Sequence, residues 1–313
     1  MNTNRLMTRA DQERGVRPLE VLGRESACCV AAMFLAARRG RGVSRATAAY
    51  WMARRFLGVL GTPVDDNRLV SFRFDGPHGP VTVRVRRNQS DLMVLWEVLL
   101  HCSYDLAAEY GVRMPERLDT IVDLGANTGL ASAYLCARYR PRVLLAVEPV
   151  PDNVAVLRGN ARLSGTDWHI EEAAVGSRAG SVELFVSGLW DSCTTHPEVA
   201  HARRTDPDRL EPLMPRPAVS ARMLSMPDLF DRHGLATIDL LKVDIEGGES
   251  DLFAEPEPWM NRVDRIVAEI HDKYIDGDAV RVTLHRAGFD RIEPRRTGPV
   301  RGTPNRVELF LRR

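Results

Sequence analysis

From Asp119 onward, short runs of branched apolar residues alternate with longer segments that have a helical pattern. The apolar runs are TIVDL, VLLAVE, WHIEEAAV, IDLLKVDI and RIVAEI. The segments that separate them are 128–139, 151–163, 223–233 and 247–254. Short apolar strands separated by helices are typical of a parallel sheet that is covered on both faces. The pattern therefore predicts an α/β fold.

The end of the chain departs from this alternation. GFDRIEP and RVELFLRR both read as strands, and the loop between them contains no helical pattern. Two strands joined without a crossover helix pair in opposite directions. We therefore expect a mostly parallel sheet that closes with an antiparallel hairpin.

The first part of the chain predicts a different arrangement. Residues 26–60 have a helical pattern that is interrupted at 39–42, and the alternating runs Leu69–Phe74 and Val81–Arg87 predict a β-hairpin. Residues 91–110 then predict a helix capped by Ser90. We expect the arginines at 84–87 to lie on a solvated strand edge.

Between residues 187 and 219 the chain is polar and rich in proline, which predicts a long loop that covers a site. The expected organisation is a helical extension over 1–65 followed by a main domain over 66–313. The cofactor-binding core of that domain would span 119–313.

Composition narrows the class of protein. The chain has 313 residues, 44% hydrophobic and 27% charged, with a net charge of +1. Such values are typical of a globular protein and argue against nucleic-acid or membrane partners. The five cysteines include no C-x-x-C pair, and the apolar stretch ACCVAAMFLAA has about half the length of a membrane span. We therefore expect a cytoplasmic protein.

VDLGANTG has the features of a ligand-binding loop between a strand and a helix. Asp123 ends the strand, Gly125 and Gly129 lie in the turn, and Asn127 lies between them. Glycines let the backbone approach a ligand, and the next helix offers free N–H groups. Glu148 ends the following strand, where nucleotide-binding units place a carboxylate for the ribose.

The acid beside this loop discriminates between two cofactors. A dinucleotide would place its pyrophosphate there, and Asp123 would repel it. S-adenosyl-L-methionine has an ammonium and a sulfonium instead, and a carboxylate attracts both. After the third strand, EEAAVG provides Ala173 for an adenine face, with Glu172 or a backbone group for its amine. The alternatives are a capped strand–helix turn and an ordinary strand end.

A second group of polar residues lies in LLKVDIEGGE. Spacing by two places Lys242, Asp244 and Glu246 on one side of an extended chain. VAEIH places Glu269 and His271 at the end of the next strand. These side chains would surround one crevice, with His271 as a general base.

Two other interpretations of this cluster remain. Lys242 could form an ion pair that holds neighbouring strands, and His271 could simply satisfy a neighbour at the strand end. The cluster could also bind a divalent cation through Asp244, Glu269 and His271, and the cation would acidify a substrate hydroxyl.

VDLGANTG, AVEPVPDNVAVLRGN, AAVGSRAGSVEL, DLLKVDIEGGESDLF and VAEIH resemble the FkbM family of S-adenosylmethionine-dependent methyltransferases in their order along the chain. The resemblance covers about residues 119–293. It implies a Rossmann-like class I fold, a seven-stranded sheet with an antiparallel last strand, and methylation of hydroxyl groups on natural products or sugars.

The hypothesis is an in-line methyl transfer to a hydroxyl, with His271 as base, Asp244 on the donor's amino end or the substrate, and Lys242 holding the carboxylates. The alternatives are a cation-dependent O-methyltransferase, an N- or carboxyl methyltransferase, a dehydrogenase, and a non-catalytic partner subunit. We expect a small-molecule acceptor and a homo-oligomer formed through the N-terminal helices.

Overall fold

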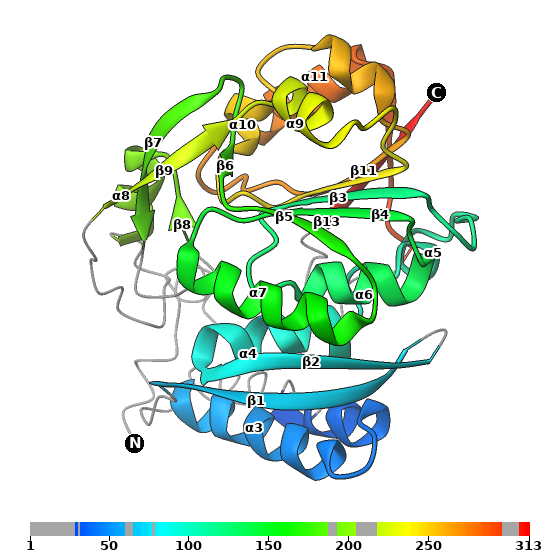
Figure 1. Ribbon diagram of the computed structural model, residues 1–313, viewed down its shortest axis with the longest axis vertical. Helices are drawn as coiled ribbons and strands as arrows, with labels where there is room; N and C mark the ends of the chain where they lie inside the picture. Colours follow the sequence, from blue (N-terminus) through cyan, green and yellow to red (C-terminus); the bar gives the residue numbers. More distant parts are fainter. Residues whose placement is uncertain are drawn as a thin grey trace, which may run out of the picture.

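A seven-stranded sheet forms the centre of the computed structural model (Figure 1), in the order β12-β13-β11-β10-β3-β4-β5. The structure describes residues 29–30, 32–59, 65–76, 79–186, 193–204, 218–295 and 307–313. The strands are β3 (Thr120–Leu124), β4 (Val143–Val147), β5 (Trp168–Glu171), β10 (Leu240–Val243), β11 (Arg265–Glu269), β12 (Phe289–Ile292) and β13 (Val307–Arg312). Six of these strands run in one direction, and β13 runs antiparallel to both of its neighbours, β11 and β12. The predicted Rossmann-like class I sheet is confirmed.

The strand order determines where a ligand can bind. From β3 the chain moves outward through β4 to β5, and it later returns to β10 on the other side of β3. Open α/β sheets bind ligands at the carboxyl ends of their strands, where the order reverses in this way. The loop after β3 and the turn after β10 therefore lie next to each other at that edge.

Helices cover both faces of the sheet (Figure 1). On one face lie α6 (Leu130–Tyr139) and α7 (Pro151–Ser164); on the other lie α9 (Met226–His233), α10 (Glu249–Leu252) and α11 (Gly277–Arg286). A short 3₁₀ helix, η3, spans Pro258–Arg262. Successive strand residues alternate between two cores: Ile121 packs with the first set of helices, and Val122 packs with the second.

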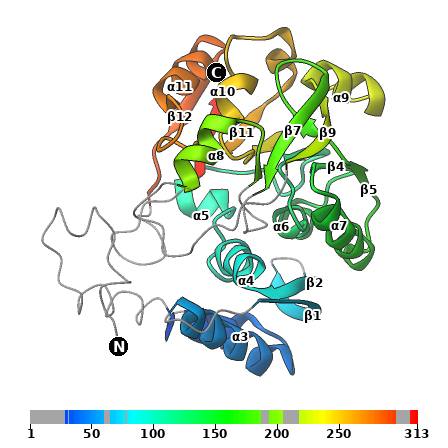
Figure 2. The same cartoon turned by 90° about the vertical axis from the view of Figure 1, so that its left-hand side faces the viewer.

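The N-terminal residues form further layers beneath α6 and α7. These layers contain α3 (Ser44–Val59), the hairpin β1 (Asp65–Gly76) and β2 (Gly79–Asn88), and α4 (Gln89–Leu95). Figure 2 shows the same succession of layers from the side. Met52, Phe72 and Leu144 belong to one hydrophobic cluster, so the core continues from these layers into the sheet.

Three details of the N-terminal prediction are wrong. The expected helix over 91–110 is divided into α4, a π-helical turn η2 (Trp96–Leu100) and α5 (Leu106–Tyr110). Its cap is Asn88, whose side chain accepts from the Asp91 amide, because Ser90 already lies inside the first turn. Arg86 is buried rather than solvated, with a relative exposure of 4%.

A second, four-stranded sheet was not predicted. It consists of β6 (Ala174–Val175), β9 (Val219–Leu224), β7 (Gly180–Val186) and β8 (Cys193–Thr194), in that order. WHIEEAAV was read as one strand, but it divides between β5 and β6 because β6 pairs with β9 and not with the main sheet. The helix expected from residue 223 starts at Met226, after the Ser225 cap.

The expected covering loop at 187–219 is described only in part, since 187–192 and 205–217 lie outside the described residues. The described part contains β8 and the helix α8 (Pro197–Arg204). Val199 of α8 is buried and packs near Gly247, in the turn after β10. Among the described helices, none has the length and apolar character needed to cross a membrane.

Candidate active site

The glycine loop leaves β3 and passes close to the turn after β10. Gly125 has a φ of +72°, and a Cβ atom built there would lie 1.8 Å from the carbonyl oxygen of Asp244. A side chain at this position is therefore excluded by the neighbouring backbone. The close approach that requires glycine is between two segments of the protein, whereas the sequence suggested an approach to the ligand.

Asp123 lies beneath this loop and has no solvent-exposed surface. Its carboxylate is fully buried, and Oδ2 accepts a hydrogen bond of 2.6 Å from the Ser132 hydroxyl. The Nζ atom of Lys242 lies 3.0 Å from Oδ1 and donates to the Gly125 carbonyl at 2.8 Å. The expectation that Asp123 contacts the cofactor is therefore corrected: the acid anchors a lysine that holds the loop.

The charge state of Lys242 follows from its neighbours. Burial favours the neutral amine, but the carboxylates of Asp123 and Asp244 outweigh this effect and raise the pKa of Lys242. The lysine therefore carries its positive charge in the interior. The prediction that Lys242 holds carboxylates agrees with its 3.0 Å and 3.6 Å distances to Asp123 and Asp244.

Glu148, at the end of β4, connects the glycine loop to α7. Its Oε2 accepts from the backbone amide of Asn127 at 2.9 Å, and its Oε1 accepts from the Val150 amide and the Asn153 side chain, each at 3.1 Å. Burial raises the pKa of Glu148, while these hydrogen bonds oppose the shift. The carboxylate therefore joins the Asn127 amide of the loop to the first turn of α7, and its role toward a ribose stays a prediction.

The residues after β5 divide into a buried and an exposed set. The Glu172 side chain is half-exposed and lies 3.5 Å from Arg158, whereas Ala173 is buried. Glu171 is the buried acid, and it accepts from Arg232 and His233, each at 3.0 Å. The structure thus gives Glu172 a partner at the surface of α7, and an adenine contact here would come from Ala173 or the backbone.

The turn after β10 places the second group of acids. The strand ends at Val243, so Asp244 and Glu246 lie beyond it, and Glu246 has a φ of +58°. The extended backbone predicted through Glu246 is therefore wrong. Burial raises the pKa of Asp244, and the nearby charge of Lys242 opposes the shift.

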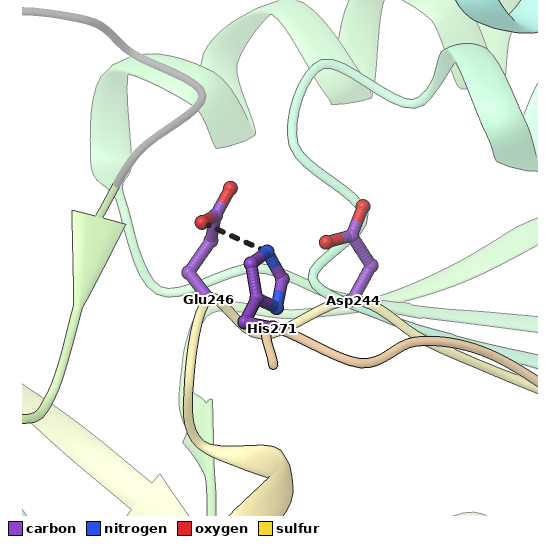
Figure 3. A group of neighbouring side chains, drawn as sticks. All are labelled: Asp244, Glu246 and His271. Carbon is purple, nitrogen blue, oxygen red and sulfur yellow. Dashed lines mark ion pairs between the residues drawn. The ribbon is translucent and has the colours of Figure 1, made fainter. Parts of the chain in front are cut away.

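His271 lies between two carboxylates after β11. Its Nε2 is 3.2 Å from Oε2 of Glu246, and Figure 3 shows the ring between Asp244 and Glu246. Its Nδ1 is 3.2 Å from Oε1 of Glu249. Burial lowers the pKa of a histidine, but the two carboxylates outweigh burial and raise the pKa of His271 well above 6.5.

Glu249 is a site residue to which sequence analysis gave no role. It is fully buried at the start of α10 and accepts from the backbone amides of Ile245 and Gly247, both at 3.0 Å. One carboxylate therefore holds the turn and the His271 ring together. Its position three residues after Glu246, at the start of a helix, was the available signal, because acids there cap free N–H groups.

Tyr104 is a second residue missed by the sequence analysis, and it comes from the segment between η2 and α5. Its side chain is buried, with a relative exposure of 5%. Burial raises its pKa, and the negative charges of Asp244 and Glu269 add to the shift. The segment between η2 and α5 therefore contributes a buried tyrosine whose pKa responds to the charge of these acids.

Three of these side chains could hold a cation. The ligand atoms of Asp244, Glu246 and His271 lie within 4.8 Å of one another. The predicted set contained Glu269 instead of Glu246. Glu246 belongs to the set because its Oε2 lies 3.2 Å from Nε2 of His271.

The comparison with protein families decides the identity of this arrangement. The model of the methyltransferase FkbM domain matches residues 123–291, more than half of the chain. The chain belongs to the FkbM methyltransferase family. It is an S-adenosyl-L-methionine-dependent methyltransferase, as the resemblance implied.

Individual relatives of this FkbM methyltransferase are moderately similar. The 31-O-demethyl-FK506 methyltransferase FkbM of Streptomyces tacrolimicus is 28% identical and aligns over 51% of this chain and 67% of its own. Methyltransferase sdnD of Sordaria araneosa is 29% identical over 61% of this chain and 78% of its own. A crystal structure of methyltransferase FkbM from Methylobacillus flagellatus KT is 14% identical, with a TM-score of 0.37, over 64% of this chain and 44% of that protein.

The residues around the glycine loop fit S-adenosyl-L-methionine. Glu148 could accept from the ribose hydroxyls beside the Asn127 amide, and the partly exposed Asp244 suits an ammonium group. The lysine at this edge, Lys242, points beneath the loop to the Leu124 and Gly125 carbonyls and not toward a phosphate. Two carboxylates beside the loop and a lysine directed beneath it favour a cationic amino-acid cofactor over one with a pyrophosphate.

Proposed function

We propose that this FkbM family member is an O-methyltransferase that acts on a hydroxyl of a small-molecule natural product or a sugar. The observation that carries the proposal is the position of His271, at the carboxyl edge of the sheet between Glu246 and Glu249. S-adenosyl-L-methionine supplies a methyl group that is already activated, so the protein has to align the acceptor and remove its proton.

His271 is the proposed general base. A carboxylate can only accept, so the Nδ1–H of the neutral ring donates to Glu249. The lone pair of Nε2 then takes the proton of the acceptor hydroxyl as the methyl–oxygen bond forms and the methyl–sulfur bond breaks, which leaves S-adenosylhomocysteine as the second product. Glu246, on the same side of the ring, stabilises the imidazolium that results.

The other residues have supporting roles in this proposal. Asp244 binds the amino end of the cofactor or the acceptor hydroxyl, and Lys242 holds it in place from below. Asn127 and Glu148 hold the ribose beside Gly125 and Gly129. An acceptor of small size is supported by the near-neutral net charge of +1, which offers no general attraction for nucleic acid.

The substitution His271→Ala tests the base. We expect kcat to fall by about 10²–10⁴-fold, the usual contribution of a general base, while the Kd for S-adenosylhomocysteine stays within about threefold of wild type. A panel of hydroxylated small molecules serves as acceptors, with methylation detected by mass spectrometry. Unchanged turnover of an accepted substrate would remove His271 from the mechanism.

A cation-dependent O-methyltransferase is the second candidate, and the 4.8 Å grouping of Asp244, Glu246 and His271 supports it. A bound divalent cation would lower the pKa of an acceptor hydroxyl. The candidates differ after exhaustive dialysis against a chelator: the first predicts full activity, and the second predicts loss that Mg²⁺ or Mn²⁺ restores. Oligomerisation through the N-terminal helices stays a prediction for light scattering to test.

A further inference from the structure

A continuous set of buried polar contacts joins the β1–β2 hairpin to the cofactor loop. It begins at Arg86 on β2, which forms a bidentate ion pair with Asp91. Arg86 Nη2 also donates to Oδ1 of Asn153 at 2.7 Å, and Asn153 Nδ2 donates to Oε1 of Glu148 at 3.1 Å. Glu148 in turn accepts from the Asn127 amide at 2.9 Å.

The orientation of the central amide follows from hydrogen-bond chemistry. A guanidinium can only donate and a carboxylate can only accept, so Asn153 has to direct its oxygen to Arg86 and its nitrogen to Glu148. Asn153 and Glu148 are 1% and 4% exposed, and Arg86 is 4% exposed. In such a buried setting each unpaired group is costly, so the contacts restrict one another.

A second connection runs parallel to the first. Asn160, two helical turns after Asn153 on α7, is fully buried. Its Nδ2 donates to the Thr128 carbonyl of the glycine loop at 2.7 Å and to the Arg84 carbonyl of β2 at 2.9 Å. Its Oδ1 accepts from the Arg84 amide at 2.7 Å. The hairpin therefore reaches the loop by two routes through one helix.

We propose that the β1–β2 hairpin is a part of the cofactor site, in which Arg86 and Asn153 position Glu148 and the Asn127 amide for the ribose hydroxyls. The hairpin precedes residue 123, where the family match starts. The inference rests on the assignment of Glu148 and Asn127 to the cofactor, but it requires neither the acceptor nor the base proposed above.

Two variants interrupt this relay, the set of contacts from Arg86 through Asn153 and Glu148 to Asn127, at different points. Asn153→Asp keeps the size and the acceptor for Arg86, but it places a second carboxylate against Glu148. Arg86→Met combined with Asp91→Asn removes the ion pair as a unit, so no buried charge is left alone. Arg73→Met is the matched control, because Arg73 lies exposed on the neighbouring strand β1.

The first measurement is the Kd for S-adenosylhomocysteine by titration calorimetry. We expect about tenfold weaker binding for Asn153→Asp and about threefold to tenfold for the Arg86/Asp91 double variant, since each loses a buried polar partner. Arg73→Met should remain within about twofold of wild type.

The second measurement is hydrogen–deuterium exchange of the protein without cofactor. We expect faster exchange in a peptide covering 122–132 for both relay variants, with unchanged exchange in α9 on the opposite face of the sheet. Unchanged binding or unchanged loop exchange in Asn153→Asp would overturn the inference. Failure of the wild type to bind the cofactor product would instead count against the assigned cofactor site, while the exchange comparison would still decide whether the hairpin holds the loop.

Discussion

The glycine loop after β3 and the turn after β10 lie side by side, and each contains a non-glycine residue with a positive φ, Asn127 at +50° and Glu246 at +58°. They are held differently. The loop receives hydrogen bonds and charge from Glu148 and from residues on α7 and β10. In the turn, the amides of Ile245 and Gly247 donate to Glu249, which is only three residues from Glu246. The glycine loop, which is the proposed cofactor half of the site, is thus held by residues from several elements. The turn after β10, which is the proposed reaction half, receives the Glu249 contacts from within its own segment.

This difference has a consequence for how each half responds to change. Several independent contacts hold the glycine loop in position. Losing one of them should therefore weaken cofactor binding only moderately, unless the loss leaves a buried charge without its partner. In the turn, the Glu249 carboxylate holds two backbone amides and also contacts His271. A conservative substitution there should affect catalysis more than cofactor binding.

The largest expected effect comes from Lys242→Met, which leaves the Asp123 carboxylate buried without its cation. Breaking a buried pair costs about 3–5 kcal/mol, and we expect a decrease of that size in the free energy of unfolding, measured in urea. Lys273→Met is the control, because Lys273 is exposed and is the other lysine of the chain. A loss below about 1 kcal/mol would show that the ion pair does not brace the loop.

Glu249→Gln should separate catalysis from binding. The amide nitrogen would face either a backbone N–H or the donor on His271, which costs about 1–3 kcal/mol and disturbs the ring. We expect kcat to fall by about 10–100-fold while the Kd for S-adenosylhomocysteine changes by less than about threefold. Glu255→Gln, at an exposed acid, is the control. Equal losses in kcat and affinity would contradict local bracing.

The pH dependence of kcat/KM should show a smaller effect on the reaction half alone. The pKa of His271 is raised, so the ring is charged at neutral pH and becomes a base only as the pH increases. We therefore expect kcat/KM to rise with pH beyond the ordinary histidine value of about 6.5, while cofactor affinity stays flat over the same range. A plateau that begins below that value would contradict the assignment.

The smallest effect is expected for Glu172→Gln. Its side chain and that of Arg158 are both half-exposed, and surface pairs of this kind contribute about 0–1 kcal/mol. Affinity for S-adenosylhomocysteine should change by less than about twofold, whereas Glu148→Gln should weaken it by about tenfold or more. A similar loss of affinity in both variants would show that Glu172 contacts the adenine.

The main sheet could be predicted because its strands are short, apolar and separated by helices, and the closing antiparallel pair lacks a crossover. The second sheet could not: β6 and β8 have two residues each, and such short strands leave no periodic pattern. The predicted site residues lie close together because strands β3, β10 and β11 are neighbours. That Lys242 would pair with carboxylates could be predicted, but which residues from distant parts of the chain pair with Asp123 and His271 could not.

Asp123 illustrates this limit. Its place before the glycines correctly indicated the cofactor class, yet the reason is indirect, since the carboxylate pairs with Lys242 from a strand about 120 residues later. The same holds for Arg86, whose alternating strand pattern suggested exposure. The position of a residue in the sequence predicts on which face of a strand its side chain lies. Whether another layer of the protein covers that face depends on the tertiary fold.

The contact of Gly125 with the Asp244 carbonyl has a further consequence for engineering. The main chain of the glycine loop at Gly125 lies directly against the main chain of Asp244. We therefore expect side-chain changes elsewhere to leave the relative position of these two segments unchanged. Under the proposed roles, the methyl donor and the proton acceptor would keep their spacing when residues that do not contact the loop or the turn are exchanged. A scaffold with that property is suited to directed evolution toward new acceptors, because libraries can vary residues around the proposed site without realigning its two reactive centres.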